Sequence, residues 1–473
     1  MEQINKKTKI IATVGPACNT KEKLWELVKA GANIFRLNFS HGSHEAHLQV
    51  IQYIRELNKE HNANIAILQD LQGPKIRTNE VENNGVELIE GAQIVITKEY
   101  CMGTKEKIST SYQSLTSDVK PGDAILIDDG KIELKVLSAK DGEVTAEIVY
   151  GGILKSKKGI NLPNTNVSEP SLTEKDRKDL IFGIEQGLDW IALSFVRRAE
   201  DMKDLKEIIK KSGKDIKVVA KIEKPEAIAN IDEIIEEADA IMVARGDLGV
   251  EVLMEDVPMM QKMIVKKCGL AGKPVIIATQ MMESMITNPR PTRAETNDVA
   301  NAIIDGADTV MLSAETASGE YPVLTVQSMA RICASVEKQA EAIYNKHINR
   351  DNASYSDSVI ATACALADQV NAKAIIGLSQ SGYSAFRIAS HRPKADIIIV
   401  TSDKGMLTKL SLVWGVKAVY YDKFTTTDET IQGVKDLLVK QGLLKKGDTY
   451  VTTASMPFTY TQRANTLKLG IVE

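Results

Sequence analysis

The feature that most constrains the fold is a repeated alternation between short apolar runs and longer amphipathic stretches. The runs are rich in Val and Ile, and this alternation is typical of buried parallel strands joined by crossover helices. Eight such runs can be counted, at residues 9–13, 33–38, 64–70, 189–196, 217–223, 240–245, 274–280 and 309–315. Eight strand and helix units predict a closed (β/α)8 barrel, whose catalytic groups lie where the strands end.

Polar side chains gather at the predicted carboxyl ends of six of these runs, where core packing does not explain them. Because those ends meet at one face of a barrel, we expect the side chains to share one site. They are Arg36, Asn38, Ser40, Asp70, Lys221, Glu223, Arg245, Asp247, Thr279, Ser313 and Glu315.

Two further regions depart from the barrel rhythm. Between the third and fourth runs, alternating segments such as KIELKVL and EVTAEIVY are separated by turns such as PGD and KDGE, which predicts an inserted all-β domain. Its root beside the third strand would let it close over the site as a lid. We therefore expect a barrel of residues 1–77 plus 165–345, a β lid of residues 78–164 and a C-terminal α/β regulatory domain of residues 346–473.

Composition excludes several classes of function. The net charge of -4 provides no general basic surface for nucleic acid or for an acidic membrane. The five cysteines are scattered without CxxC spacing, as expected of reduced thiols. No stretch approaches the roughly 20 apolar residues of a membrane span. We expect a soluble, cytoplasmic protein.

A divalent metal site is predicted at the fifth and sixth strands. Lys221 and Glu223 are two residues apart, so they point the same way from a strand. Glu223 and Asp247 would supply two carboxylate ligands to Mg2+ or Mn2+, which keeps other positions for water and substrate oxygens. Gly246 allows the backbone to approach a small ligand closely. Taken alone, a Lys-x-Glu triplet is usually a surface ion pair, and Asp247 could simply cap a helix.

The chemistry predicted for this face is phosphoryl transfer, which needs positioning and neutralised charge. Arg36 can bind phosphate in a bidentate fork, and Lys221 brings a compact positive charge to the group in transfer. Thr279 offers a hydroxyl which, with Ser313 and Glu315, could relay a proton to an enolate. A threonine at a strand end is more often a packing or capping residue.

Nucleotide binding would come from a composite site. Arg77 lies at the root of the insert, and Lys157 and Lys158 lie where the chain returns, so all three could reach phosphates when the lid closes. Neither GxxxxGKS nor a GxGxxG in a strand-to-helix turn is present, which excludes a P-loop. The alternative for Lys157 and Lys158 is an ordinary solvated surface.

Several segments together resemble the pyruvate kinase family over essentially the whole chain. They are RLNFSHG, GPKIRT, SKKGINLP, AKIEKPEA, MVARGDLGVE, ATQMMESMI, PTRAETNDVANAI and MLSAETASGEYP. The resemblance implies transfer of a phosphoryl group from phosphoenolpyruvate to ADP, giving pyruvate and ATP, as the last step of glycolysis. It also implies the three-domain plan and a homotetramer.

The resemblance further implies residue roles. Lys221 would be the transition-state stabiliser, and Glu223 and Asp247 the metal ligands. Contacts to the substrate would come from Arg36, Lys221, Arg245, Gly246, Asp247 and Thr279. Contacts to the nucleotide would come from Asn38, Phe39, Ser40, His41, Arg77 and Lys158.

One departure from the family pattern concerns a monovalent cation. Where many members have Thr, Lys and Glu after the third strand, this chain has Leu71, Gln72 and Lys75. In K+-dependent members, groups matching Asn38, Ser40, Asp70 and the carbonyl of Leu71 surround the ion. We expect the ammonium of Lys75 to replace K+ here, unless Lys75 points to solvent.

A second departure concerns regulation. The C-terminal segment SMPFTYTQRANTLKLGIVE lacks the Gly-rich loop associated with activation by fructose 1,6-bisphosphate. A Ser-rich turn at the start of a predicted helix offers hydroxyls and free amides for a different phosphorylated effector. It contains Ser379, Ser381, Gly382, Tyr383 and Ser384. The alternative is an ordinary helix cap.

Two rival functions remain at this point. A metal-dependent aldolase or lyase on the same barrel would form an enolate without phosphoryl transfer, which Arg36, Lys221 and the insert disfavour. A catalytically inactive sensor of a sugar phosphate is disfavoured because the constellation of site residues is complete.

Overall fold

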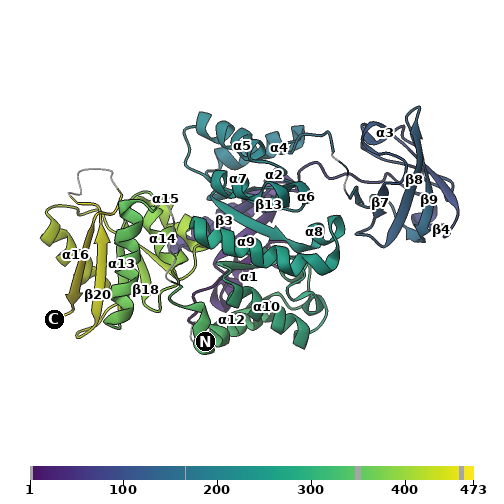
Figure 1. Cartoon of the computed structure of the whole chain (residues 1–473). Helices are drawn as coiled ribbons and strands as arrows, with labels where there is room; N and C mark the ends of the chain where they lie inside the picture. Colours follow the sequence, from purple (N-terminus) through teal and green to yellow (C-terminus); the bar gives the residue numbers. More distant parts are fainter. Residues whose placement is uncertain (1–3, 164, 166, 347–352, 457–462) are drawn as a thin grey trace.

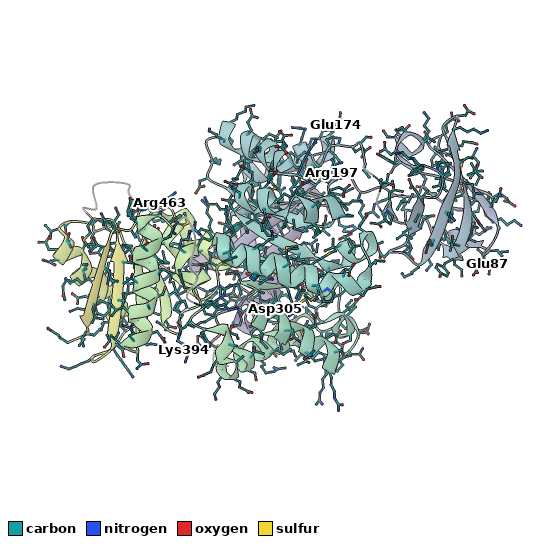
Figure 2. All side chains as sticks on the ribbon, in the orientation of Figure 1. Glu87, Glu174, Arg197, Asp305, Lys394 and Arg463 are labelled. Carbon is teal, nitrogen blue, oxygen red and sulfur yellow. The ribbon has the colours of Figure 1, made fainter. Side chains whose placement is uncertain are left out.

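The computed structural model describes residues 4–163, 165, 167–346, 353–456 and 463–473. A central barrel carries an all-β insert at one end and an α/β domain at the other (Figure 1). The side chains of Glu87 in the insert and Arg463 in the C-terminal domain lie on opposite sides of the barrel (Figure 2).

Eight parallel strands close the barrel, in the order β1-β16-β15-β14-β13-β12-β3-β2. Every residue of six of them is buried, as expected of strands covered on both faces. The strands are β1 (Lys9–Thr13), β2 (Ile34–Asn38), β3 (Ala66–Asp70), β12 (Trp190–Leu193), β13 (Lys217–Ile222), β14 (Ala240–Ala244), β15 (Val275–Ala278) and β16 (Thr309–Leu312). The predicted (β/α)8 barrel is confirmed.

Helices surround the barrel, and local capping sets several of their ends. Thr173 and Thr292 begin helices with reciprocal capping boxes, while Gly272 and Gly306 end helices in the left-handed conformation. The helices are α1 (Lys21–Ala30), α2 (His44–His61), α4 (Glu174–Glu185), α5 (Ala199–Lys211), α6 (Pro225–Ala229), α7 (Ile231–Glu237), α8 (Arg245–Glu251), α9 (Val257–Ala271), α10 (Arg293–Asp305), α11 (Ala314–Ala317) and α12 (Pro322–Gln339).

The insert between β3 and β12 has a hydrophobic core of its own. Six of its strands form a sheet in the order β11-β7-β8-β9-β5-β6, and β4 pairs with β10. Its strands are β4 (Val86–Leu88), β5 (Gln93–Thr97), β6 (Lys107–Ser109), β7 (Ala124–Ile127), β8 (Ile132–Lys140), β9 (Glu143–Tyr150), β10 (Gly152–Leu154) and β11 (Ile160–Asn161), with the short helix α3 (Leu115–Asp118). The outgoing and returning chains meet in an isolated bridge between Arg77 and Gly159.

The C-terminal part is a five-stranded sheet in the order β19-β18-β17-β20-β21 with helices on its faces. Its strands are β17 (Ala374–Leu378), β18 (Asp396–Thr401), β19 (Val416–Tyr420), β20 (Thr449–Ala454) and β21 (Thr466–Ile471). Its helices are α13 (Tyr355–Gln369), α14 (Tyr383–Ser390), α15 (Lys404–Lys409) and α16 (Thr427–Lys440). The predicted C-terminal α/β domain is confirmed.

The C-terminal domain closes the amino-terminal end of the barrel. Leu412 belongs to the hydrophobic cluster inside the barrel, and its carbonyl accepts a hydrogen bond from Thr309 at the start of β16. Trp190, at the start of β12, donates its indole N–H to the carbonyl of Lys409. Of the two ends of the barrel, the end where the strands finish is therefore the one left for a ligand.

No helix in the described part of the chain is both long and apolar enough to span a bilayer.

Candidate active site

A pocket of about 120 Å³ lies at the carboxyl end of the barrel. It brings together side chains that are far apart in the sequence, from the ends of β2, β3, β12 and β13 and from α8. Its lining consists of Arg36, Asn38, Ser40, His41, Asp70, Leu71, Gln72, Lys75, Arg77, Ser194, Phe195, Lys221, Glu223 and Asp247. Ten of the residues proposed from the sequence are in this group, together with Lys75.

Several strands end earlier than the apolar runs suggest. Strand β13 ends at Ile222, β15 at Ala278 and β16 at Leu312, so Glu223, Thr279 and Ser313 lie just beyond them. Within a strand, alternate side chains point away from the barrel axis. Residues beyond the end of a strand are free of this alternation, so consecutive residues there can all point toward the site. Thr279 has a φ of 67°, a left-handed conformation that is unusual for a β-branched residue.

Lys221 lies at the centre of the pocket's charges and is only 8% exposed. Its Nζ lies 3.1 Å from Asp70 Oδ1 and 2.9 Å from Glu223 Oε1, and it donates a hydrogen bond of 2.6 Å to Ser194 Oγ. Burial by itself lowers the pKa of Lys221, but the two carboxylates outweigh this and raise the pKa above its usual range. Lys221 is therefore a fixed positive charge at neutral pH.

Arg36 provides a second positive charge at the same place. Its Nε lies 2.6 Å from Asp70 Oδ2, and its guanidinium also donates to Thr13 Oγ1 at 3.1 Å. Burial favours a raised pKa for Asp70, but Lys221 and Arg36 reverse this effect and hold the pKa below its ordinary value. Asp70 thus stays ionised and orients both cations.

The two carboxylates proposed as metal ligands both line the pocket. Glu223 is 1% exposed, and its Oε2 accepts a hydrogen bond of 2.7 Å from the backbone N–H of Phe195. Burial raises the pKa of Glu223, although Lys221 opposes the shift. Among the described residues, no group of three His, Cys, Asp or Glu side chains is arranged to hold a metal. An ion here would rest on these two hard oxygens and on substrate and water, a donor set that suits Mg2+ or Mn2+.

Thr279, Gly246 and Arg245 form a connected group beside the pocket, outside its lining. Thr279 Oγ1 accepts a hydrogen bond of 2.7 Å from the N–H of Gly246 and donates one of 2.5 Å to the carbonyl of Ala278. The guanidinium of Arg245 binds both oxygens of Asp298, at 2.6 and 2.7 Å, and the carbonyl of Thr279 at 2.9 Å. The guanidinium of Arg245 thus forms its hydrogen bonds within the protein, and it fixes the turn that carries Thr279.

Ser313 and Glu315 also lie outside the pocket lining. Glu315 is 2% exposed, and its two oxygens accept hydrogen bonds from the backbone N–H groups of Met282, at 3.2 Å, and Ser313, at 2.6 Å. Burial raises the pKa of Glu315. In this arrangement Glu315 joins the turns after β15 and β16, and a part in proton relay stays a prediction.

The residues proposed for nucleotide binding divide into two groups. Asn38, Ser40, His41 and Arg77 line the pocket, whereas Lys158 does not. Lys158 instead forms an ion pair of 2.8 Å with Asp128 in the insert, and Phe39 is buried with its ring stacked on His47. Only the backbone of Phe39 is therefore suited to a ligand contact.

The groups proposed around a monovalent cation also line the pocket. The carbonyl of Leu71 accepts a hydrogen bond of 2.7 Å from Ser194 Oγ, and Asn38 Oδ1 accepts one of 3.1 Å from the N–H of Ser40. Lys75 lines the same pocket, and its Nζ lies 3.8 Å from Asp247 Oδ1. The alternative in which Lys75 points away into solvent therefore does not describe this structure.

The proposed effector residues lie in the C-terminal domain, between β17 and α14. Ser379 Oγ accepts a hydrogen bond of 3.1 Å from the N–H of Gly382, and Tyr383 donates its hydroxyl to Asp357 at 2.8 Å. Ser381 is exposed, but Ser384 is only 5% exposed. Residues 457–462, in the C-terminal segment compared with the bisphosphate loop, lie outside the described residues.

Ser194 and Phe195 are site residues that the sequence analysis missed. Both follow β12, the fourth barrel strand, which was assigned no site residue. Ser194 contacts Lys221, and Phe195 contacts Glu223 through its backbone. The rule used for the other strands, to look for polar groups at the strand end, would have found Ser194.

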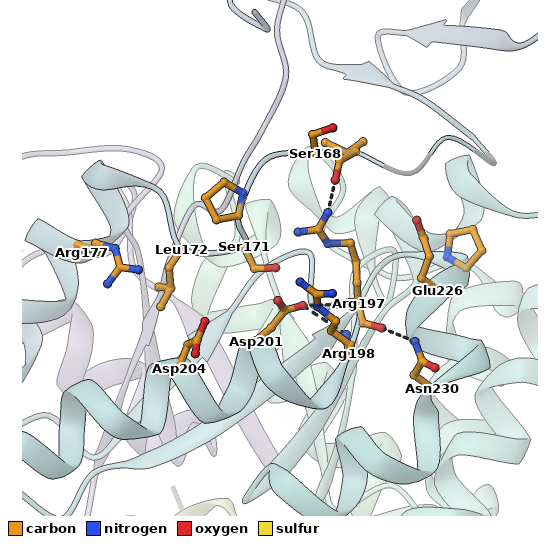
Figure 3. Close-up of a pocket in the computed structure, with 13 residues that line it drawn as sticks. Ser168, Ser171, Leu172, Arg177, Arg197, Arg198, Asp201, Asp204, Glu226 and Asn230 are labelled. Carbon is orange, nitrogen blue, oxygen red and sulfur yellow. Dashed lines mark hydrogen bonds between the residues drawn. The ribbon is translucent and has the colours of Figure 1, made fainter. Parts of the chain in front are cut away.

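A larger cavity of about 750 Å³ lies beneath the chain that returns from the insert (Figure 3). Arg197 points toward this returning chain and donates to the carbonyls of Val167 and, at 2.7 Å, Glu169. The backbone N–H of Arg197 donates to Asp201. Arg197 therefore stabilises the position of the chain that returns from the insert.

The fold and the pocket define a class: a (β/α)8 barrel enzyme with an inserted β domain, whose site for a small anionic substrate combines buried cations with acidic side chains. Comparison with known proteins gives the family. The model for the pyruvate kinase barrel domain matches residues 5–326, and the model for the pyruvate kinase alpha/beta domain matches residues 357–469. The chain belongs to the pyruvate kinase family.

Individual relatives support the same family assignment. The pyruvate kinase of Geobacillus stearothermophilus is 46% identical, over 99% of this chain and 81% of that protein. The pyruvate kinase of Clostridium acetobutylicum is 42% identical, over 99% of this chain and 100% of that protein. A crystal structure of a pyruvate kinase from Cryptosporidium parvum superposes with a TM-score of 0.93 at 37% identity, covering 99% of this chain and 96% of the other. The predicted pyruvate kinase function is confirmed, and the aldolase or lyase alternative is not supported.

Proposed function

We propose that Glu223 and Asp247 hold the divalent ion of this pyruvate kinase, as Mg2+ or Mn2+. The support is their shared pocket and their oxygen donors. When bound, such an ion supplies positive charge to substrate oxygens. Glu223 is held in place by Lys221 and by the N–H of Phe195, so its carboxylate is oriented before any ligand arrives.

In this proposal, Lys221 and Arg36 neutralise the phosphoryl group in transfer. The observation that carries it is the nearly complete burial of Lys221 between two carboxylates, because a charge held in a dry, fixed position costs little reorganisation during the reaction. Arg36 is aimed by Asp70 and binds the phosphate of phosphoenolpyruvate.

Proton delivery and nucleotide binding complete the proposed mechanism. Thr279, held against the N–H of Gly246, relays a proton from water to the enolate carbon that becomes the methyl group of pyruvate. Arg77 lines the pocket and binds ADP phosphates. Lys158 would have to exchange Asp128 for those phosphates as the insert closes. Asn38, Phe39, Ser40 and His41 would complete the nucleotide site through polar and backbone groups.

The metal assignment is tested by a coupled assay of pyruvate release from phosphoenolpyruvate, with and without ADP, in Mg2+ and in Mn2+ separately. We expect release that requires ADP and either metal, and a fall in kcat/KM of at least about 100-fold in Glu223→Gln. Glu283→Gln, a glutamate outside the pocket lining, serves as the control. Unchanged metal dependence in Glu223→Gln would exclude this carboxylate as a ligand.

An effector site at Ser379, Ser381, Gly382, Tyr383 and Ser384 is the second part of the proposal. It rests on hydroxyls and amides at the start of α14, next to the exposed Ser381. We expect a sugar monophosphate or a nucleotide to shift the half-saturating concentration of phosphoenolpyruvate, and Ser381→Glu to abolish that shift by repulsion. If no phosphorylated metabolite changes the saturation curve, the site has no such role.

The expected assembly and location follow from the family and from composition. We propose a homotetramer, measurable by light scattering, and a cytoplasmic location, which is supported by the fact that none of the five cysteines forms a disulfide bond.

A further inference from the structure

Three polar side chains meet where the insert joins the barrel. Lys224 Nζ lies 2.7 Å from Glu251 Oε1, and the same oxygen accepts a hydrogen bond of 2.8 Å from the side-chain amide of Asn161. The contact is therefore shared by two barrel elements and one strand of the insert.

The cluster is buried, so its contacts are costly to break. Glu251 is 3% exposed and Lys224 is 8% exposed. Glu251 Oε2 is also buried, with no hydrogen-bond partner among the described residues. The carboxylate thus depends on Lys224 and Asn161 alone, and removal of either donor leaves a poorly compensated buried charge.

The three residues connect the insert to both proposed metal ligands. Lys224 directly follows Glu223 in the chain. Glu251 lies four residues after Asp247 on α8, which places both on one face of that helix. Asn161 ends β11, which pairs with β7 in the sheet of the insert. Figure 1 shows α8 as a barrel element that reaches toward the insert.

The surroundings argue against a separate ligand site. The adjoining cavity, lined by Asn161, Lys224, Glu251 and Arg197 among others, measures only about 30 Å³. Such a space holds about one water molecule and no metabolite. The cluster is therefore a connection between structural elements.

We propose that Asn161, Glu251 and Lys224 form a positioning network that couples the placement of the insert to the carboxylates of Glu223 and Asp247. This inference rests on the proposed metal site. Coupling between two sites is reciprocal. An ion bound at the two carboxylates therefore holds the insert in place where it joins the barrel, and loss of the contacts at that junction lowers the affinity for the ion. The network thus links metal binding to the position of the nucleotide residues Arg77 and Lys158.

The test uses the intact protein and Mn2+ alone, without substrates. The Kd for Mn2+ is measured by electron paramagnetic resonance, and hydrogen–deuterium exchange is followed in peptides covering residues 155–163. In the wild type we expect Mn2+ to slow this exchange. In Asn161→Ala we expect a Kd at least about fivefold weaker and exchange that no longer responds to Mn2+.

Two further variants make the result specific. Asn79→Ala removes an amide of the same kind near the junction, but its hydrogen bond of 3.0 Å runs to Ser109 within the insert, so we expect wild-type values. Glu251→Gln keeps the shape and weakens the bond to Lys224, so we expect it to resemble Asn161→Ala, with circular dichroism confirming the fold.

Equal Mn2+ affinity and equal protection in Asn161→Ala, Glu251→Gln and the wild type would overturn the network. Wild-type Mn2+ binding that persists unchanged in Glu223→Gln would instead overturn the metal assignment, and the network with it.

Discussion

Replacement of Lys221 by methionine is expected to abolish phosphoryl transfer while metal binding and proton exchange at the methyl group of pyruvate continue. Lys221 is the buried ammonium beside Asp70 and Glu223, and we assign to it the charge that develops on the transferred group. The loss should be at least about 10³-fold in kcat, the upper range for one lost electrostatic contact. Deuterium exchange into pyruvate, followed by nuclear magnetic resonance, measures the retained step.

The structure adds a condition to this experiment. Methionine leaves Asp70 and Glu223 without the cation between them, so Mn2+ affinity and the circular dichroism spectrum have to be recorded for the same preparation. Lys221→Arg is the matched variant, because it keeps the charge and changes its geometry. If transfer and exchange disappear together in a folded Lys221→Met protein that still binds Mn2+, the proposed division of roles is wrong.

The enzyme is expected to work at full rate without K+. Lys75 lines the pocket with Asn38, Ser40 and Asp70, and its ammonium lies 3.8 Å from Asp247. A tethered ammonium and a free cation repel each other, by roughly 4 kcal/mol at 4 Å in an effective dielectric of 20. Turnover at saturating substrates in a tetramethylammonium buffer, with K+ added at constant ionic strength, measures the effect.

Lys75→Glu should reverse this behaviour. A carboxylate beside Asp247 repels it and attracts a cation, so activity without K+ should fall at least about tenfold, which corresponds to about 1.4 kcal/mol. Addition of K+ should then restore part of the activity. Lys75→Met separates loss of the ammonium from gain of a carboxylate. Strong stimulation of the wild type by K+ would disprove the replacement.

The sequence was informative about this site because periodicity locates the ends of strands. Parallel strands buried on both faces leave few positions for charged residues, so Arg36, Asp70 and Lys221 were conspicuous. The strand-end rule identified half of the residues that line the pocket. The rule was not applied to the fourth run, whose end carries no charged side chain, and Ser194 was therefore missed.

The ion-pair partners of the site residues were harder to predict from the sequence than the positions of those residues in the fold. Arg245 follows a barrel strand, as a substrate ligand would, yet it binds Asp298, which lies 53 residues further along the chain. Lys158 binds Asp128, which comes much earlier in the sequence of the insert. Such pairings depend on where helices and loops lie after packing, and no local pattern in the sequence encodes them. The network of Asn161, Lys224 and Glu251 was missed for the same reason.

The bridge between Arg77 and Gly159 has a consequence for how the chain folds. Because the two ends of the insert lie next to each other, the whole insert spans only a short distance between β3 and α4 of the barrel domain. The conformational entropy lost when the chain of the insert is closed into a loop is offset by the insert's own hydrophobic core. The insert can accordingly open and refold as a separate cooperative unit while the barrel strands stay paired. Local unfolding of this kind would release the nucleotide side of the active site without loss of the buried charges around Lys221.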